Sequence, residues 1–242
     1  MSALIIFGLL TALMLTGMPV SIALGLTVLG FLFAFTQVPV DTVALKLFTG
    51  IEKFEIMAIP FFILAGNFLT HGGVAKRMIN FASSLVGHWH GGLALAAVVA
   101  CALFAAISGS SPATVVAIGS IILPAMVKQG YPRQFGAGVV TTSGGLGILI
   151  PPSIVMVMYT VATSGMLAIG PDGKEVSSAS VGQMFIAGVV PGVLLGAMLA
   201  FTTWYKAKTN NYPRLPRAGW GQRIKSFREA FWGLLLVVVV MG

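Results

Sequence analysis

The sequence predicts an all-α integral membrane protein whose transmembrane helices include a re-entrant helical hairpin and a broken helix. Of its 242 residues, 57% are hydrophobic and only 8% are charged, whereas about 25% of the residues of a soluble domain are charged. The chain also carries 30 glycines and 12 prolines. Both residue types break helices and leave backbone groups that lipid cannot hydrogen-bond. We therefore expect interrupted helices around a polar cavity.

Long apolar blocks are the candidate spans, because a crossing helix needs roughly 20 residues. They run over Leu4 to Thr36 with a break at Gly17–Pro19, Ile56 to Leu69, Leu93 to Ile107, Ala113 to Val127, Phe135 to Met166, Val181 to Tyr205, and Ala230 onward. The first block forms either one kinked span or two short helices, so the side of the N-terminus stays open. It lacks a basic start and a small-residue cleavage pattern, and we expect no removable signal peptide.

Two of these blocks are too short to cross. Leu93 to Ile107 and Ala113 to Val127 each extend about 22 Å as helices, whereas the hydrocarbon core is about 30 Å thick. Between them lies the polar turn Ser108–Pro112. Lipid tolerates such a turn only where protein buries it or where it lines water. The pattern predicts a re-entrant hairpin whose tip lies near the middle of the bilayer.

The next block has the opposite problem. Phe135 to Met166 would extend about 48 Å as one straight helix. Its middle contains the polar and glycine-rich run Thr141–Gly147, followed by Pro151–Ser153. We expect a single span with an unwound centre.

Positive charge fixes the expected orientation. The formal net charge is +8, and seven of the fourteen Lys and Arg lie between Lys206 and Arg228. The positive-inside rule places that segment in the cytoplasm. If Leu93 to Val127 is re-entrant, eleven of the fourteen Lys and Arg lie in the cytoplasm. If instead the first of its two blocks crosses fully and the second turns back, Lys128 and Arg133 lie outside and only nine remain in the cytoplasm. A nucleic-acid or anionic-lipid patch is the alternative for this segment, and we expect no nucleic-acid partner because basic cytosolic loops are common.

The basic segment also contains an amphipathic stretch. Trp220, Ile224, Phe227 and Phe231 recur at helical spacing after a segment whose prolines cannot continue a helix. We expect a helix lying on the inner leaflet of the membrane, in contact with lipid. The alternative is a linker whose aromatic side chains pack on neighbouring helices.

The polar breaks carry the candidate chemistry. From Gly91 to Val127 and from Gln134 to Pro171 the sequence has no Asp, Glu, Lys, Arg or His, which excludes a proton relay. Hydroxyls, backbone carbonyls and helix ends remain, and these suit an alkali cation and an anion at a helix N-terminus. Sodium is therefore the expected coupling ion, with no other cofactor. The alternative is that the serines only cap and turn helices and the glycines only pack.

An intramembrane serine hydrolase is the remote alternative. Its nucleophile would be Ser110 or Ser143, and its base would be His71, His88 or His90. All three histidines lie at the ends of apolar blocks, where they suit the membrane interface. No metal-ligand spacing and no phosphate-binding loop is present. We expect no enzyme.

Several runs together resemble one family. They are Ala105–Thr114, Ala117–Gly119, Leu123–Pro124, Gly130–Tyr131 and Gly147–Ser153, with Ile59–Phe62 and Gly66–Asn67 before them. The chain resembles, over essentially its whole length, the large membrane subunit of tripartite ATP-independent periplasmic (TRAP) transporters. The likeness is greatest to members that carry C4-dicarboxylates.

The resemblance implies a protein of the bacterial inner membrane that takes part in sodium-driven uptake of an organic acid. It implies a periplasmic substrate-binding protein and a small four-helix membrane subunit as partners, and an elevator motion of the hairpin-containing domain. Family members have roughly twice this mass, with a second hairpin and a second broken helix in inverted orientation. The chain thus corresponds to the N-terminal half of an inverted-repeat transporter. The alternative is a channel or scaffold component that does not transport.

The resemblance also suggests which residues form the site and how the chain is divided. The expected sodium ligands are Ser108, Gly109, Ser110, Ser111, Ser143, Gly144, Gly147 and Pro151. The expected substrate contacts are Ser110, Thr114, Thr142, Pro152 and Ser153. The expected parts are scaffold helices over 1–90, the transport-domain hairpin and broken helix over 91–166, a periplasmic loop and return helix over 167–205, a cytoplasmic linker over 206–229, and the start of a further helix over 230–242.

Overall fold

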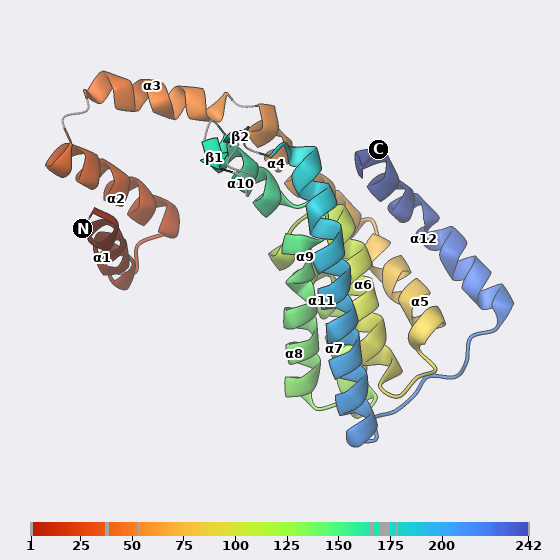
Figure 1. Ribbon diagram of the computed structural model, residues 1–242. Coiled ribbons are helices and arrows are strands. Elements are labelled where there is room, and N and C mark those ends of the chain that lie inside the picture. Colours follow the sequence, from red (N-terminus) through yellow and green to blue (C-terminus); the bar gives the residue numbers. More distant parts are fainter. Residues whose placement is uncertain are drawn as a thin grey trace. The chain divides into compact units, whose positions relative to one another are not determined.

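The computed structural model describes residues 2–36, 39–52, 54–164, 167–169, 175–177 and 179–241. The chain forms two compact units, Met1–Lys53 and Phe54–Gly242. Helices make up nearly all of the described structure (Figure 1), which confirms the predicted fold class. The exception is a short antiparallel hairpin of β1 (Leu167–Ile169) and β2 (Glu175–Ser177), which the sequence did not indicate.

The first unit contains two apolar helices and one amphipathic helix. The block that begins the chain forms α1 (Ser2–Leu15) and α2 (Val20–Phe35), which lie side by side. Gly17 turns the chain with a φ of +79°, a conformation that glycine adopts without strain. This resolves the open question in favour of two short helices. The third helix, α3 (Val40–Ile51), was not predicted, because its apolar face is interrupted by polar residues.

The second unit is a bundle built around one helix. Its helices are α4 (Phe54–His71), α5 (Val74–Val86), α6 (Gly92–Ser108), α7 (Ser111–Lys128), α8 (Arg133–Gly144), α9 (Leu146–Leu149), α10 (Ile154–Thr163), α11 (Val181–Thr209) and α12 (Trp220–Met241). Helix α6 contacts α4, α5, α7, α8, α9, α11 and α12. Its many alanines are buried, and small residues let membrane helices approach closely. The core of the unit therefore follows α6.

Helices α6 and α7 form the predicted hairpin. Gly109 ends α6 in the left-handed conformation with a φ of +61°, and Ser110 is extended before α7 begins. Pro112 occupies the first turn of α7, where its missing N–H is tolerated. By length and composition α7 is also able to cross a membrane, so the depth of the tip stays a prediction.

The predicted break is confirmed at Pro151–Ser153, but the expected unwound run Thr141–Gly147 is helical apart from Gly145, and a single span across the break stays a prediction. Helices α8 and α9 are followed by four non-helical residues and then by α10, with a bend of 41° across that break. The break contains Ile150, the cis-linked pair Pro151–Pro152, and Ser153. The Ser153 hydroxyl donates a hydrogen bond of 2.7 Å to the carbonyl of Ile148 and holds the two sides of the break together.

The C-terminal part differs in detail from the prediction. Helix α11 continues four residues beyond Tyr205, and α12 runs without interruption across the expected boundary at 229/230. No proline interrupts it, and Ala230 is buried while Gly233 lies against Met78 of α5. The amphipathic stretch is therefore the first half of a long helix. Of its four apolar residues, Phe227 packs against Phe81 with the two rings tilted by 54°, whereas Trp220 and Ile224 are 78% and 64% exposed.

Candidate functional site

The tip of the hairpin rests against the break of the broken helix. The carbonyl of Gly109 accepts a hydrogen bond of 3.1 Å from the backbone N–H of Ile154, the first residue of α10. A Cβ atom at Gly109 would lie 2.6 Å from the carbonyl oxygen of Pro152. The two polar interruptions therefore meet through their backbones.

Two further glycines permit this close approach. A Cβ atom at Gly147 would lie 2.9 Å from the backbone nitrogen of Ser111, and one at Gly144 would collide with the side chain of Val115. Both glycines lie on the broken helix and face the start of α7. They give the hairpin and the broken helix one shared, tightly packed surface.

Some of the expected site hydroxyls already have partners. The oxygens of Ser108 and Thr114 lie 3.0 Å apart, and the Thr114 hydroxyl donates to the carbonyl of Ser110 at 2.9 Å. Both side chains are almost fully buried. These bonds tie the end of α6 to the first turn of α7 and fix the shape of the tip.

Three hydroxyls at the contact have no partner among the described residues. The Ser143 hydroxyl is completely buried near the end of α8. Ser110 and Ser111 are half-buried at the tip, and neither side chain makes a hydrogen bond within the described structure. Ser110 occupies the N-cap position of α7, but its side chain makes no capping bond. An unsatisfied buried hydroxyl costs about 1–3 kcal/mol, so Ser143 in particular needs a ligand or an explanation.

The structure brings together most of the expected site residues. Pro151, Pro152 and Ser153 are buried at the break. Thr142 is the exception, because its side chain is exposed and its hydroxyl donates to Gly138 of its own helix at 2.7 Å. Sequence reasoning also missed Gly66 of α4, where a Cβ atom would lie 3.7 Å from the Cβ of Ser108. The sequence signalled it only through the run Gly66–Asn67, which carries part of the family resemblance.

The histidines do not complete a hydrolytic site. His88 and His90 precede α6, whose length of about 26 Å separates them from the tip. Nδ1 of His71 lies 2.9 Å from the carbonyl of Asn67 in its own helix. Among the described residues no histidine is hydrogen-bonded to Ser110 or Ser143, so the structure gives the hydrolase alternative no support.

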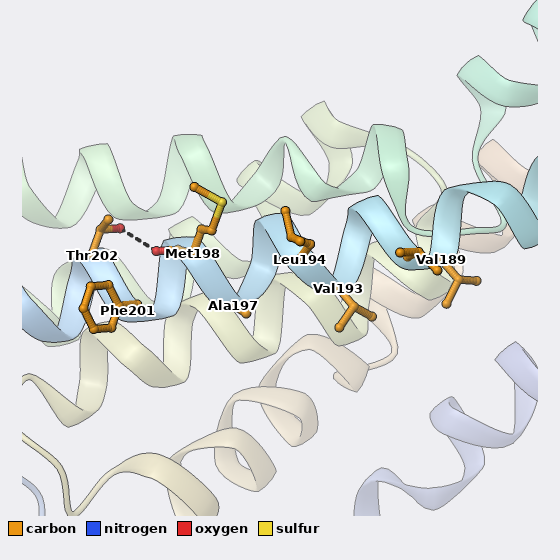
Figure 2. A pocket seen from close by; sticks show the side chains of 8 residues that line it. Val189, Val193, Leu194, Ala197, Met198, Phe201 and Thr202 are labelled. Carbon is orange, nitrogen blue, oxygen red and sulfur yellow. Dashed lines mark hydrogen bonds between the residues drawn. The ribbon is translucent and has the colours of Figure 1, made fainter.

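A groove along α11 is a different kind of surface. Figure 2 shows its lining, which runs along one side of that helix and has a volume of about 720 Å³. Its residues are Val189, Val190, Val193, Leu194, Ala197, Met198, Phe201 and Thr202. The only hydroxyl, that of Thr202, donates to the carbonyl of Met198 at 3.0 Å. Without free polar groups, the groove suits acyl chains and not an organic acid.

Comparisons with known proteins show the family of the chain. Residues 7–242 match the family described as tripartite ATP-independent periplasmic transporter, DctM component. A C4-dicarboxylate TRAP transporter large permease protein of Rhodobacter capsulatus is 78% identical over 242 residues, which are 100% of this chain and 55% of that protein. The protein of the same name from Vibrio cholerae is 49% identical over 100% of this chain and 51% of its own length. The 2,3-diketo-L-gulonate TRAP transporter large permease protein of Escherichia coli is 33% identical over 100% of this chain and 54% of its own length.

The chain spans about half the length of these relatives. They are transporter permease proteins and not enzymes, as the sequence predicted. The match also confirms the expected location as a multi-pass protein of the bacterial inner membrane. The chain therefore belongs to the family of DctM components of tripartite ATP-independent periplasmic transporters.

Proposed function

We propose that the chain forms one half of the permease of a sodium-coupled importer of C4-dicarboxylates. In this proposal a periplasmic substrate-binding protein supplies the dicarboxylate and a small four-helix membrane subunit completes the transporter. The relatives from Rhodobacter capsulatus and Vibrio cholerae are named for C4-dicarboxylates. The substrate assignment depends on those names, whereas the ion assignment depends on the geometry of the tip and the break.

The observation that carries the ion assignment is the buried, unpartnered hydroxyl of Ser143. It precedes Gly144, whose Cβ position lies against Val115 in the first turns of α7, the helix that begins at the unpartnered hydroxyls of the tip. Neutral oxygens are the ligands of a hard alkali cation. A sodium ion bound there would satisfy Ser143 and recover the cost of burying it.

The anion assignment follows from two helix ends. Helix α7 begins at Ser111 and α10 begins at Ile154, and the bond between Gly109 and Ile154 holds these two N-termini near each other. Helix N-termini attract anions through their free N–H groups and the helix dipole. A carboxylate of the substrate would bind between them, next to the cation. This proximity would couple sodium binding to substrate binding, because the cation and the carboxylate stabilise each other.

The same packing supports an elevator motion. Gly109 and Gly147 approach backbone atoms across the contact and Gly144 approaches the side chain of Val115, so the hairpin and the broken helix have little room to slide past each other. In the proposed cycle these elements move as one body and carry the site with them. A channel would instead need the two elements to separate.

Sodium binding is tested by Ser143→Ala in the complete transporter. Without sodium this variant should be at least as stable as the parent, since it removes an unsatisfied hydroxyl. Sodium should raise the melting temperature of the parent by mass action and have little effect on the variant. In proteoliposomes the sodium concentration for half-maximal succinate uptake should rise about tenfold or more. Ser120→Ala is the control, because the Ser120 hydroxyl donates to Ala117 of its own helix.

Two results would contradict the proposal. An equal sodium-induced shift in melting temperature in Ser143→Ala and the parent would remove Ser143 from the ion site. Conductance without saturation and without a sodium requirement would favour a channel over a carrier.

A further inference from the structure

A second polar site lies at the other end of the bundle from the hairpin tip. A crevice of about 510 Å³ opens between α5, the linker that follows α11, and the first turns of α12. The side chains that matter for its chemistry are Asn80, Ser83, Arg217, Gln222, Lys225 and Ser226. Glu229 is the one acid in the lining.

Hydrogen bonds between distant segments build this crevice. The backbone N–H of Leu215 donates to the carbonyl of Gly87 at 2.9 Å, which fixes the linker against the end of α5. Nε of Arg223 donates to the carbonyl of Ser84 at 3.2 Å, which fixes the start of α12 against the same helix. The Arg223 guanidinium also lies 5.6 Å from the centre of the Trp220 ring. The walls are therefore held in place by groups other than the ones that face the crevice.

The groups that face the crevice are unused. Within the described structure, Arg217 and Lys225 make no ion pair, and Glu229 accepts no bond from either of them. Asn80, Ser83, Gln222 and Ser226 likewise make no side-chain hydrogen bond there. A guanidinium, an ammonium, two amides and two hydroxyls provide the donors that a phosphate oxygen accepts from.

Exposed apolar side chains near the crevice indicate that a phosphate bound there belongs to a lipid. Trp232 lies two turns beyond Lys225 on the same side of α12 and is 72% exposed, and Trp220 and Ile224 on the opposite side of the helix are 78% and 64% exposed. Exposed tryptophans mark the level of the lipid headgroups. A ligand at this place meets donors on one side and an apolar helix face on the other. Only a molecule with both a charged head and an acyl chain satisfies both.

We propose that this crevice binds the phosphodiester headgroup of an anionic phospholipid. Arg217 and Lys225 hold the phosphate oxygens, the amides and hydroxyls accept and donate around the headgroup, and the acyl chains lie along the exposed face of α12. Glu229 limits the affinity through repulsion. The inference does not depend on sodium coupling or on the identity of the transported acid.

Lipid binding is tested on the complete transporter in detergent, with phosphatidylglycerol as the probe and native mass spectrometry as the readout. The double variant Arg217→Gln, Lys225→Gln should lose about tenfold or more in affinity. Lys206→Gln, Lys208→Gln is the matched control, because it removes the same charge from the end of α11, outside the crevice lining. Glu229→Gln should bind several-fold more tightly, a gain that misfolding cannot produce.

Two further measurements distinguish an anionic lipid headgroup from other lipids and from free phosphate. Phosphatidylcholine should bind at least tenfold more weakly than phosphatidylglycerol, and 10 mM inorganic phosphate should displace less than half of the bound lipid. If both double variants lost the same affinity for phosphatidylglycerol, general surface charge would explain the binding and the proposal would be overturned. Tight binding of inorganic phosphate with no preference for the lipid would also overturn it.

Discussion

The phenolic hydroxyl of Tyr131 donates a hydrogen bond of 2.9 Å to the backbone carbonyl of Pro213, 82 residues further along the chain. Tyr131 lies in the turn between α7 and α8, and its ring packs against Phe135 and Tyr212 at centroid distances of 6.3 and 5.1 Å. Burial raises the pKa of Tyr131 to about 12, so its hydroxyl remains a donor at neutral pH. The basic linker is thereby anchored to the base of the hairpin.

Tyr131→Phe should loosen this anchor without disturbing the ring packing. We expect a loss of about 1 kcal/mol in the free energy of unfolding, the usual net value of one hydrogen bond. Trypsin should also cleave faster after Arg214, which is exposed in the anchored segment. The control is Tyr205→Phe, because Tyr205 is 59% exposed on α11. Equal cleavage rates for all three proteins would show that the bond does not hold the linker.

A second contact makes the linker sensitive to pH. Nη2 of Arg214 lies against Nε2 of His90 and requires the neutral imidazole as acceptor. Desolvation, with Arg214 and Lys208, lowers the pKa of His90 below its ordinary value of 6.5. The docked state thus binds fewer protons than the undocked state as the pH falls through 6.5, so acid favours undocking.

The expected result is several-fold faster tryptic cleavage in the linker at pH 5.5 than at pH 7.5. Rates are normalised to an unstructured peptide cleaved at the same pH, which removes the pH dependence of trypsin itself. His90→Gln has no titrating group and should show the same normalised rate at both pH values. A pH dependence that persists in His90→Gln would assign the effect to another group.

The contact between tip and break is tested by adding single methyl groups. Gly147→Ala places a Cβ atom 2.9 Å from the backbone nitrogen of Ser111, and backbone atoms cannot yield as a flexible side chain does. Overpacking of this kind costs about 1–3 kcal/mol. The melting temperature should fall and succinate uptake should be lost. Gly138→Ala on α8 is the control, because nothing lies within 4 Å of its Cβ position, and it should be neutral or stabilising.

The sequence predicted the elements whose signal is local. A polar, glycine-containing turn between two apolar blocks and a double proline within a third mark helix breaks wherever they occur, so the hairpin tip and the region around Pro151 were correctly placed. Helices α3 and α5 were missed because each is short and mixes apolar with polar residues. The start of α12 was predicted, but its continuity past Ala230 depends on packing against α5.

Contacts between distant segments left no such signal. Nothing near Tyr131 in the sequence indicates Pro213 as its partner, and nothing distinguishes Ser143, whose hydroxyl has no partner in the described structure, from Ser108, whose hydroxyl is satisfied. The exposed side chain of Thr142 next to the buried Ser143 follows from the rotation of α8 within the bundle. Such distinctions depend on tertiary packing, which only the folded structure reveals.

The last prediction concerns the depth of the hairpin in the membrane, which follows from the positions along α11 that the hairpin and the break contact. At the base of the hairpin, Gly91 lies against Ala207 of α11. The break that receives the tip lies against the first third of α11, where a Cβ atom at Gly188 would be 2.7 Å from the carbonyl oxygen of Leu149. Helix α11 begins at Val181, about 11 Å beyond Gly188. The hairpin therefore stops well short of the far end of this spanning helix.

Nitroxide labels at Pro112→Cys, next to the tip, and at Lys128→Cys, at the end of α7, should report this difference in depth. In liposomes Pro112→Cys should collide mainly with oxygen, which concentrates in the bilayer centre, and Lys128→Cys mainly with a water-soluble nickel complex. The label at Lys128→Cys should also share the accessible face of one at Lys208→Cys, because Tyr131 and Pro213 join the turn after α7 to the basic linker. A tip label as accessible to nickel as the Lys128→Cys label, or a Lys128→Cys label on the opposite face, would mean that the hairpin is not re-entrant.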